Sequence, residues 1–179
     1  MLKVKSFECK AHAKINLFLN VYDKTKDNLH NLKSLIYFID LYDEITISES
    51  KTFSIIVKGP FKNYIKKKNI IEKTFLTFSN FLNLKKNYRI CLNKRIPVTA
   101  GLGGGSADAA AVLKGLNYLS KKKIKKKDLY KIAATIGSDV PVCLFNNNAF
   151  FSGYGEILSK SPKIPKFSIL LINPRKELS

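Results

Sequence analysis

The chain has 179 residues, of which 45% are hydrophobic, so it can bury the core of one domain of ordinary size. This composition excludes intrinsic disorder over most of the chain. No run of about eighteen apolar residues occurs, which excludes a membrane-spanning helix. The first ten residues alternate charged and apolar side chains and lack the apolar stretch of a signal peptide, so we expect a cytoplasmic protein.

The net charge of +19 has two explanations. A strongly basic chain attracts polyanions such as nucleic acid and nucleotides. The alternative is compositional drift, because Lys, Asn, Ile, Phe and Tyr are abundant and lysines cluster in the turn-like segments 66–68 and 121–127. We favour drift, so the charge is compatible with an anionic substrate but does not identify one.

The cysteines show no pattern that binds a metal or forms a redox pair. Cys9, Cys91 and Cys143 are widely separated, and each stands among apolar neighbours. A small buried side chain is the usual explanation for such a residue. We therefore expect three reduced cysteines in the core.

The first half of the chain is rich in short segments typical of strands. Branched and aromatic residues separated by polar turns predict strands over 4–9, 13–22, 32–38, 44–48 and 52–58. Apolar residues at helical spacing then predict a helix over 69–82, with Asn69 as its N-cap.

The second half mixes helices with strands. The pattern predicts a strand over 88–92, a loop over 93–105, an Ala-rich helix over 106–119, a helix over 128–136 ended by Gly137, two strands around 153–155 and a strand over 167–172. Asp139 would lie between a helix and an apolar strand. Strands first and then helices mixed with strands indicate an α+β domain.

The strongest feature is the glycine-rich segment from Pro97 to Ser106. Four glycines fall within the five positions 101–105, which costs chain entropy unless the backbone adopts unusual conformations or closely approaches a ligand. A helix begins directly afterwards, and the free N–H groups at its N-terminus form an anion site. The segment predicts phosphate binding.

Three well-known phosphate-binding motifs do not fit this segment. A Walker loop needs Lys before Ser106, and the dinucleotide-binding fingerprint needs Gly at that position. The His-Arg-Asp and Asp-Phe-Gly signatures of protein kinases are absent from the sequence. The loop therefore belongs to another class of phosphate binder.

Two charged residues become candidates for catalysis when they are considered together with this loop. Alone, Lys14 would be an exposed strand residue that shares a strand face with Asn16, and Asp139 would be a turn or capping residue. Phosphoryl transfer to an alcohol, however, needs a carboxylate to orient the hydroxyl and a cation to offset developing charge. Beside the loop, Asp139 would supply such a carboxylate and Lys14 such a cation.

The loop resembles that of the GHMP kinases, whose pattern is Pro, three residues, Gly-Leu-Gly, small residues and a helix. The triple glycine at 103–105 and the segments 13–17 and 137–141 are similar to the branch that phosphorylates cytidine-diphosphate-linked methylerythritol in isoprenoid precursor synthesis. The segment from Asn28 to His30 resembles that branch's cytosine-reading segment, with Leu29 in place of an aromatic. His12 stands in place of a proline.

The resemblance implies a small-molecule kinase, a phosphotransferase that uses ATP with Mg²⁺. It implies Lys14 and Asp139 as catalytic residues and Asn16, His30 and Asp139 as substrate-binding residues. Nucleotide contacts are implied for Asn69, Lys94, Pro97, Val98, Thr99, Ala100, Gly101, Leu102, Gly103, Gly104, Gly105, Ser106 and Ala107. Ser106 is a candidate metal contact, and the sequence contains no evident protein-built metal cage.

The resemblance also implies a fold like domain 2 of ribosomal protein S5. We expect residues 1–165 to form the N-terminal ATP-binding domain and residues 166–179 to begin a ferredoxin-like domain whose remainder is absent. Two alternatives stay open: another GHMP kinase for a small alcohol, and an inactive basic remnant that binds nucleotide or nucleic acid.

Overall fold

The computed structural model describes residues 5–24, 30–66, 69–153, 157–165 and 167–173. One six-stranded sheet has the order β3-β4-β2-β5-β6, and β1 pairs with β2. The strands are β1 (Ser6–Lys24), β2 (His30–Ser50), β3 (Ser54–Lys58), β4 (Asn87–Asn93), β5 (Ala149–Gly153) and β6 (Ile157–Lys160). The helices are α1 (Ile70–Leu82), α2 (Gly104–Leu119), α3 (Lys126–Ile136) and α4 (Val140–Phe145), with a short 3₁₀ turn at Lys62–Tyr64. The α+β prediction is confirmed.

Two long curved strands, β1 and β2, make up much of the sheet. The strands predicted over 4–9 and 13–22 are one continuous strand, β1, of 19 residues. Those predicted over 32–38 and 44–48 are likewise one strand, β2, of 21 residues. They pair antiparallel, with shifts in register between His12 and Lys14, Asn16 and Phe18, and Val21 and Lys24. Such bulges bend a strand without ending it. The prediction of separate strands was wrong, because bends looked like turns.

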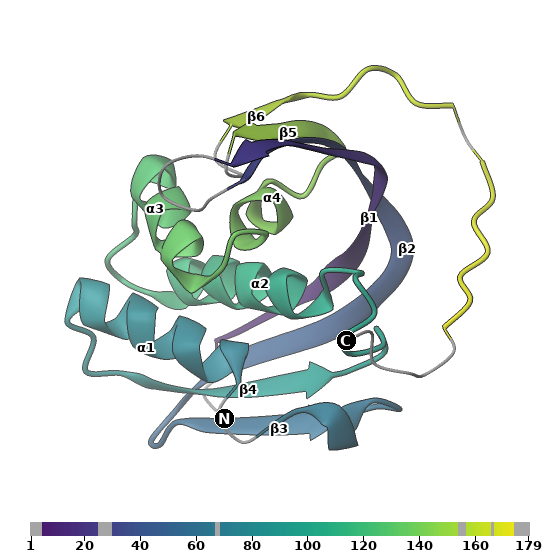
Figure 1. Ribbon diagram of the computed structural model, residues 1–179. Helices are drawn as coiled ribbons and strands as arrows, with labels where there is room; N and C mark the ends of the chain where they lie inside the picture. The colour runs from purple at the N-terminus through teal and green to yellow at the C-terminus, as the bar shows by residue number, and fades with distance from the viewer. Residues whose placement is uncertain (1–4, 25–29, 67–68, 154–156, 166, 174–179) are drawn as a thin grey trace.

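The helices cover one face of this curved sheet (Figure 1). The central helix, α2, is rich in Ala and Leu and buries ten of its residues between the sheet and the other helices. Gly115 allows its close approach, because a Cβ there would lie 2.6 Å from both Ile47 Cδ1 and Phe7 Cδ1. The core therefore lies between α2 and the inner face of β1 and β2.

The predicted helix over 69–82 is confirmed, including its cap. Asn69 Oδ1 accepts hydrogen bonds from the backbone N–H groups of Ile71 at 3.0 Å and Glu72 at 3.2 Å. These bonds satisfy two of the free donors at the helix start. The helices predicted over 106–119 and 128–136 are also present, and each begins two residues earlier than predicted.

Two predicted strands are wrong. Val140–Phe145 is the short helix α4, because Pro141 suits a first helical turn and a short apolar run does not distinguish helix from strand. Residues 167–172 are extended without strand pairing in the described chain, and they pass outside the curved sheet (Figure 1). Leu170 is 84% exposed and Ile172 is 83% exposed. Strand propensity alone does not make a strand without a paired neighbour.

The three cysteines are free, as predicted, but only Cys143 is fully buried. Burial raises the pKa of the Cys143 thiol to about 12 and that of the half-buried Cys9 to about 11. Cys91 is half-buried. Separately, none of the helices in the described residues has the length and apolar character needed to cross a bilayer.

Candidate active site

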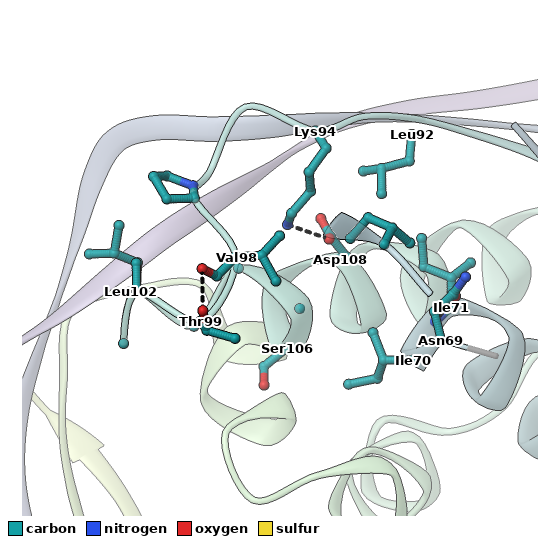
Figure 2. Close-up of a pocket in the computed structure, with 17 residues that line it drawn as sticks. Asn69, Ile70, Ile71, Leu92, Lys94, Val98, Thr99, Leu102, Ser106 and Asp108 are labelled. Carbon is teal, nitrogen blue, oxygen red and sulfur yellow. Dashed lines mark hydrogen bonds and ion pairs between the residues drawn. The ribbon is translucent and has the colours of Figure 1, made fainter. Parts of the chain in front are cut away.

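A cavity of about 300 Å³ opens at the N-terminus of α2. All residues from Pro97 to Ser106 line it, together with Asn69 and Lys94 (Figure 2). Its remaining walls are mostly apolar, from Ile65, Ile70, Ile71 and Leu92. An apolar pocket that ends in a glycine-rich loop suits a flat base at one end and phosphates at the other.

The loop backbone is unusual at three alternate positions. Thr99, Gly101 and Gly103 have φ angles of +60°, +71° and +65°. Left-handed residues interspersed in a loop turn successive backbone N–H groups toward one side, which creates a concave anion site. Thr99 is β-branched, and such residues rarely adopt positive φ, so its conformation is strained.

The N-terminus of α2 completes this anion site. Gly103 is the N-cap and supplies no side chain to the first turn. The 16 residues of α2 present the positive end of the helix dipole to the cavity, and Ser106 in its first turn is one of the lining residues. Helix and loop together therefore form a concave site whose backbone N–H groups and dipole suit an anion such as phosphate, and we call this site the phosphate cradle.

Strand β1 contacts this cradle at Lys14. The backbone N–H of Lys14 donates to Leu102 O at 2.9 Å. A Cβ on Gly103 would lie only 2.8 Å from Lys14 Cγ. The β-bulge next to Lys14 directs this side chain, which is 5% exposed as a residue, across the loop.

Lys14 and Asp139 lie side by side, although 125 positions separate them in sequence number (139 − 14). Lys14 Nζ is 3.2 Å from Asp139 Oδ2, and the Asp139 side chain is 34% exposed. Lys14 Nζ also donates to Asn16 Oδ1 at 3.4 Å, so the predicted shared face of Lys14 and Asn16 is confirmed. A partly open carboxylate beside a cation can meet an incoming hydroxyl group.

The first turn of α4 supports this placement of Asp139. Asp139 precedes α4 as its N-cap residue, yet its side chain makes no capping hydrogen bond. Its carbonyl oxygen accepts the first bond of the helix, from Cys143 N at 3.1 Å. The backbone therefore fixes Asp139, while its carboxylate stays directed to Lys14.

Sequence reasoning missed a buried charge cluster beneath the loop. Lys94 Nζ lies 2.5 Å from Asp43 Oδ2 and 2.7 Å from Asp108 Oδ2, and all three residues are at most 2% exposed. Burial opposes the charge on Lys94, yet the two carboxylates raise its pKa above the ordinary value. Two features of the sequence could have indicated the cluster. Asp108 is the single acidic residue of the Ala-rich helix, and Lys94 stands next to the loop.

Most of the proposed nucleotide contacts gather at one cavity. Ala107 does not line it and is buried in α2 at 4% exposure. Both ends of the Asn69 amide are engaged, since Nδ2 donates to Lys66 O at 3.2 Å. His30 begins β2, and its side chain lies outside the described part of the chain.

No group of three or more potential metal-binding side chains occurs within the described residues. Mg²⁺ bound with a nucleotide typically takes most of its ligands from phosphates and water. Ser106 lines the cavity, and its hydroxyl is of the chemical type that could serve as a single protein ligand.

Comparison with known proteins identifies relatives of this site. Residues 63–147 match the sequence profile described as GHMP kinases N terminal domain. The 4-diphosphocytidyl-2-C-methyl-D-erythritol kinases of Paramagnetospirillum magneticum and Clostridium botulinum (strain Loch Maree) are each 41% identical over 170 and 172 residues. These matches cover 94% and 95% of this chain but only 60% and 61% of the relatives. The chain thus spans about three fifths of the relatives' length.

Solved structures show a similarity to the same kinases. The crystal structure of a 4-(cytidine 5'-diphospho)-2C-methyl-D-erythritol kinase aligns with a TM-score of 0.73 at 33% identity, covering 89% of this chain and 56% of that one. A homoserine kinase from Cytophaga hutchinsonii aligns over 85% of this chain and 49% of its own, with a TM-score of 0.55 at 17% identity, which shows the shared fold alone.

Proposed function

We propose that the chain is a GHMP kinase and that it transfers the γ-phosphoryl group of ATP to the 2-hydroxyl of 4-diphosphocytidyl-2-C-methyl-D-erythritol. The observation that carries the proposal is the 3.2 Å pair of Lys14 and Asp139 beside the phosphate cradle. The named relatives, at about 40% identity over nearly the whole chain, support the choice of substrate.

In this proposal the pair acts on the acceptor hydroxyl. Asp139 orients the hydroxyl and accepts its proton as the oxygen attacks the γ-phosphorus. Lys14 stabilises the negative charge on the Asp139 carboxylate and on the transferring phosphoryl group. Because Lys14 N is bonded to Leu102 O, the ammonium keeps a fixed position relative to the phosphate loop.

The nucleotide would lie in the 300 Å³ cavity. Its base would occupy the apolar walls, and its phosphates would meet the loop from Pro97 to Ser106 and the N-terminus of α2. Mg²⁺ would be held by phosphate oxygens with Ser106 as its protein ligand, and it would neutralise charge on the phosphates. Asn69 and Lys94, the two adenosine contacts that the resemblance implies, also line this cavity.

The substrate would lie on the Lys14 side of the loop. Asn16, whose Oδ1 accepts a hydrogen bond from Lys14 Nζ, would contact the methylerythritol part. His30 would read the cytosine edge, since an imidazole offers both a donor and an acceptor. We assign residues 1–165 to the ATP-binding domain and residues 166–179 to the start of a second domain. The need for ATP favours the cytoplasm.

Substrate-dependent release of ADP tests this function. The purified chain, alone and with the C-terminal part of the Paramagnetospirillum relative added, is given Mg·ATP and one alcohol at a time. Faster ADP release with 4-diphosphocytidyl-2-C-methyl-D-erythritol than with mevalonate or homoserine is the expected result. A preference for mevalonate or homoserine would identify another GHMP kinase. Salt-dependent binding of random RNA without turnover would identify the nucleic-acid-binding remnant.

A further inference from the structure

Three ionisable side chains are buried together beneath the phosphate loop. Asp43 is 0% exposed, and Lys94 and Asp108 are each 2% exposed. Removing three such groups from water is costly, and apolar side chains of similar volume often replace buried ion groups without loss of stability. Stability alone is therefore a weak explanation for this cluster, and its location offers a better one.

The cluster joins the two ends of the phosphate loop. The loop leaves β4 at Lys94, and Asp108 lies in the second turn of α2, where the loop ends. Asp43, in β2, bonds through Oδ2 to Lys94 and through Oδ1 to the backbone N–H groups of Arg95 at 2.5 Å and Ile96 at 2.9 Å. Both ends of the loop are thus tied to one buried point.

The same side chains form part of the nucleotide cavity. Figure 2 shows Lys94 directed down to Asp108 at the wall of the pocket. A Cβ on Gly104 would lie 3.0 Å from Lys94 Nζ, so the ammonium is directly against the first turn of α2. Two of the three ammonium donors are engaged by carboxylates, which directs Lys94 toward the protein rather than toward a ligand.

We propose that Asp43, Lys94 and Asp108 act together as a positioning unit, which holds the phosphate loop in its binding shape before a nucleotide arrives. The proposal rests on the proposed function of the loop. A loop with fixed ends leaves less ordering to the ligand, which raises affinity. Thr99 and Gly103 keep their left-handed conformations more readily when both loop ends are fixed.

The polar atoms of the unit are satisfied mainly by one another and by the loop backbone. Asp43 accepts three hydrogen bonds, one from Lys94 Nζ and two from backbone N–H groups. Burial raises the pKa of Asp108 well above its ordinary value, with Lys94 opposing and Asp43 adding to this rise. Asp108 Oδ1 has no hydrogen-bond partner among the described residues.

The experiment separates positioning from stability. Fluorescent mant-ADP with Mg²⁺ is titrated into the purified chain, and thermal midpoints are recorded without ligand. The variants are Lys94→Met and the neutral triple variant Asp43→Asn/Lys94→Met/Asp108→Asn. The control is Lys86→Met, which removes an exposed lysine 2.6 Å from Glu49 Oε1, away from the cavity.

Lys94→Met should lower the thermal midpoint and weaken mant-ADP binding by about tenfold or more, because two buried carboxylates lose their cation and the loop loses its tie. The triple variant should recover most of the midpoint, since it leaves no buried charge, but should remain about tenfold weak for mant-ADP. Lys86→Met should bind mant-ADP like the wild type.

A triple variant that regains both the midpoint and wild-type affinity would overturn the proposal, because the cluster would then be structural only. Wild-type affinity in a folded Lys94→Met variant would also overturn it. If Lys94→Met fails to fold, the triple variant alone decides. Failure of the wild-type chain to bind mant-ADP would instead remove the proposed function itself.

Discussion

The side chain of Lys14 crosses Gly103 so closely that a β-carbon on Gly103 would lie 2.8 Å from Lys14 Cγ and 2.9 Å from Lys14 Cε. Gly103→Ala should therefore displace the lysine as well as strain the loop, whose φ of +65° disfavours alanine by about 1–2 kcal/mol. We expect loss of ATP-induced thermal stabilisation, measured by differential scanning fluorimetry.

Gly101→Ala is the matched control for this substitution. Gly101 has a φ of +71°, but a Cβ there would meet no described heavy atom within 4 Å. It therefore carries the same backbone strain without the clash. Equal loss of ATP stabilisation in Gly101→Ala and Gly103→Ala would show that the contact with Lys14 is irrelevant to the site.

The next two glycines should differ from each other. A Cβ on Gly104 would lie 2.9 Å from Ile96 Cγ2 and 3.0 Å from Lys94 Nζ, whereas a Cβ on Gly105 would lie 3.7 Å from Ile70 Cγ2, an ordinary contact. Gly104→Val should abolish ATP-dependent stabilisation, and Gly105→Ala should keep a ligand-free midpoint close to that of the wild type. Unchanged ATP stabilisation in Gly104→Val would remove the loop from the nucleotide site.

His30 should affect the substrate and not the nucleotide. If its imidazole pairs with cytosine, His30→Ala should weaken binding of the cytidylated substrate by about 1–3 kcal/mol, because a polar base edge is left unpaired. The affinity for ATP should stay near that of the wild type. Isothermal titration with each ligand separates the two effects, and equal losses for both would indicate a folding defect.

The pKa of Asp108 predicts a pH dependence of stability. The pKa of Asp108 is raised in the folded state. Its contribution to the free energy of unfolding is therefore fully present below the unfolded-state pKa of about 3.9 and is lost as pH rises through the folded-state pKa. Asp108→Asn cannot ionise and lacks this loss. Urea unfolding between pH 4.5 and 8 should therefore show the variant gaining relative to the wild type as pH rises. Parallel curves would contradict the raised pKa of Asp108.

Local patterns predicted much of the fold. Helical spacing and the capping preference of Asn69 located α1, and the glycine-rich loop before an Ala-rich segment located α2. The continuity of β1 and β2 could not be predicted, because their bends depend on bulges and on packing against the helices. Asp43 looked like turn material in the sequence, yet it is a buried partner of Lys94 from another part of the sheet.

The candidate site was predicted only in part for a similar reason. The loop residues are consecutive in the sequence, so their pattern alone predicts a phosphate site. Lys14 and Asp139 are ordinary residues taken singly, and only tertiary packing brings them to 3.2 Å. The helix α4, which fixes Asp139, was mistaken for a strand because a short apolar run fits both structures.

The chemistry proposed for Lys14 and Asp139 is tested most directly by a double-mutant cycle on turnover. Asp139→Asn keeps the shape of the side chain but removes the charge that orients the hydroxyl, and Lys14→Met removes the cation. Each should lower turnover by about 10²–10⁴-fold while nucleotide binding is largely retained, and the double variant should be little worse than either single variant, because the two residues act as a unit. ADP release is measured with the C-terminal part of a relative added. Losses that multiply in the double variant would contradict the account.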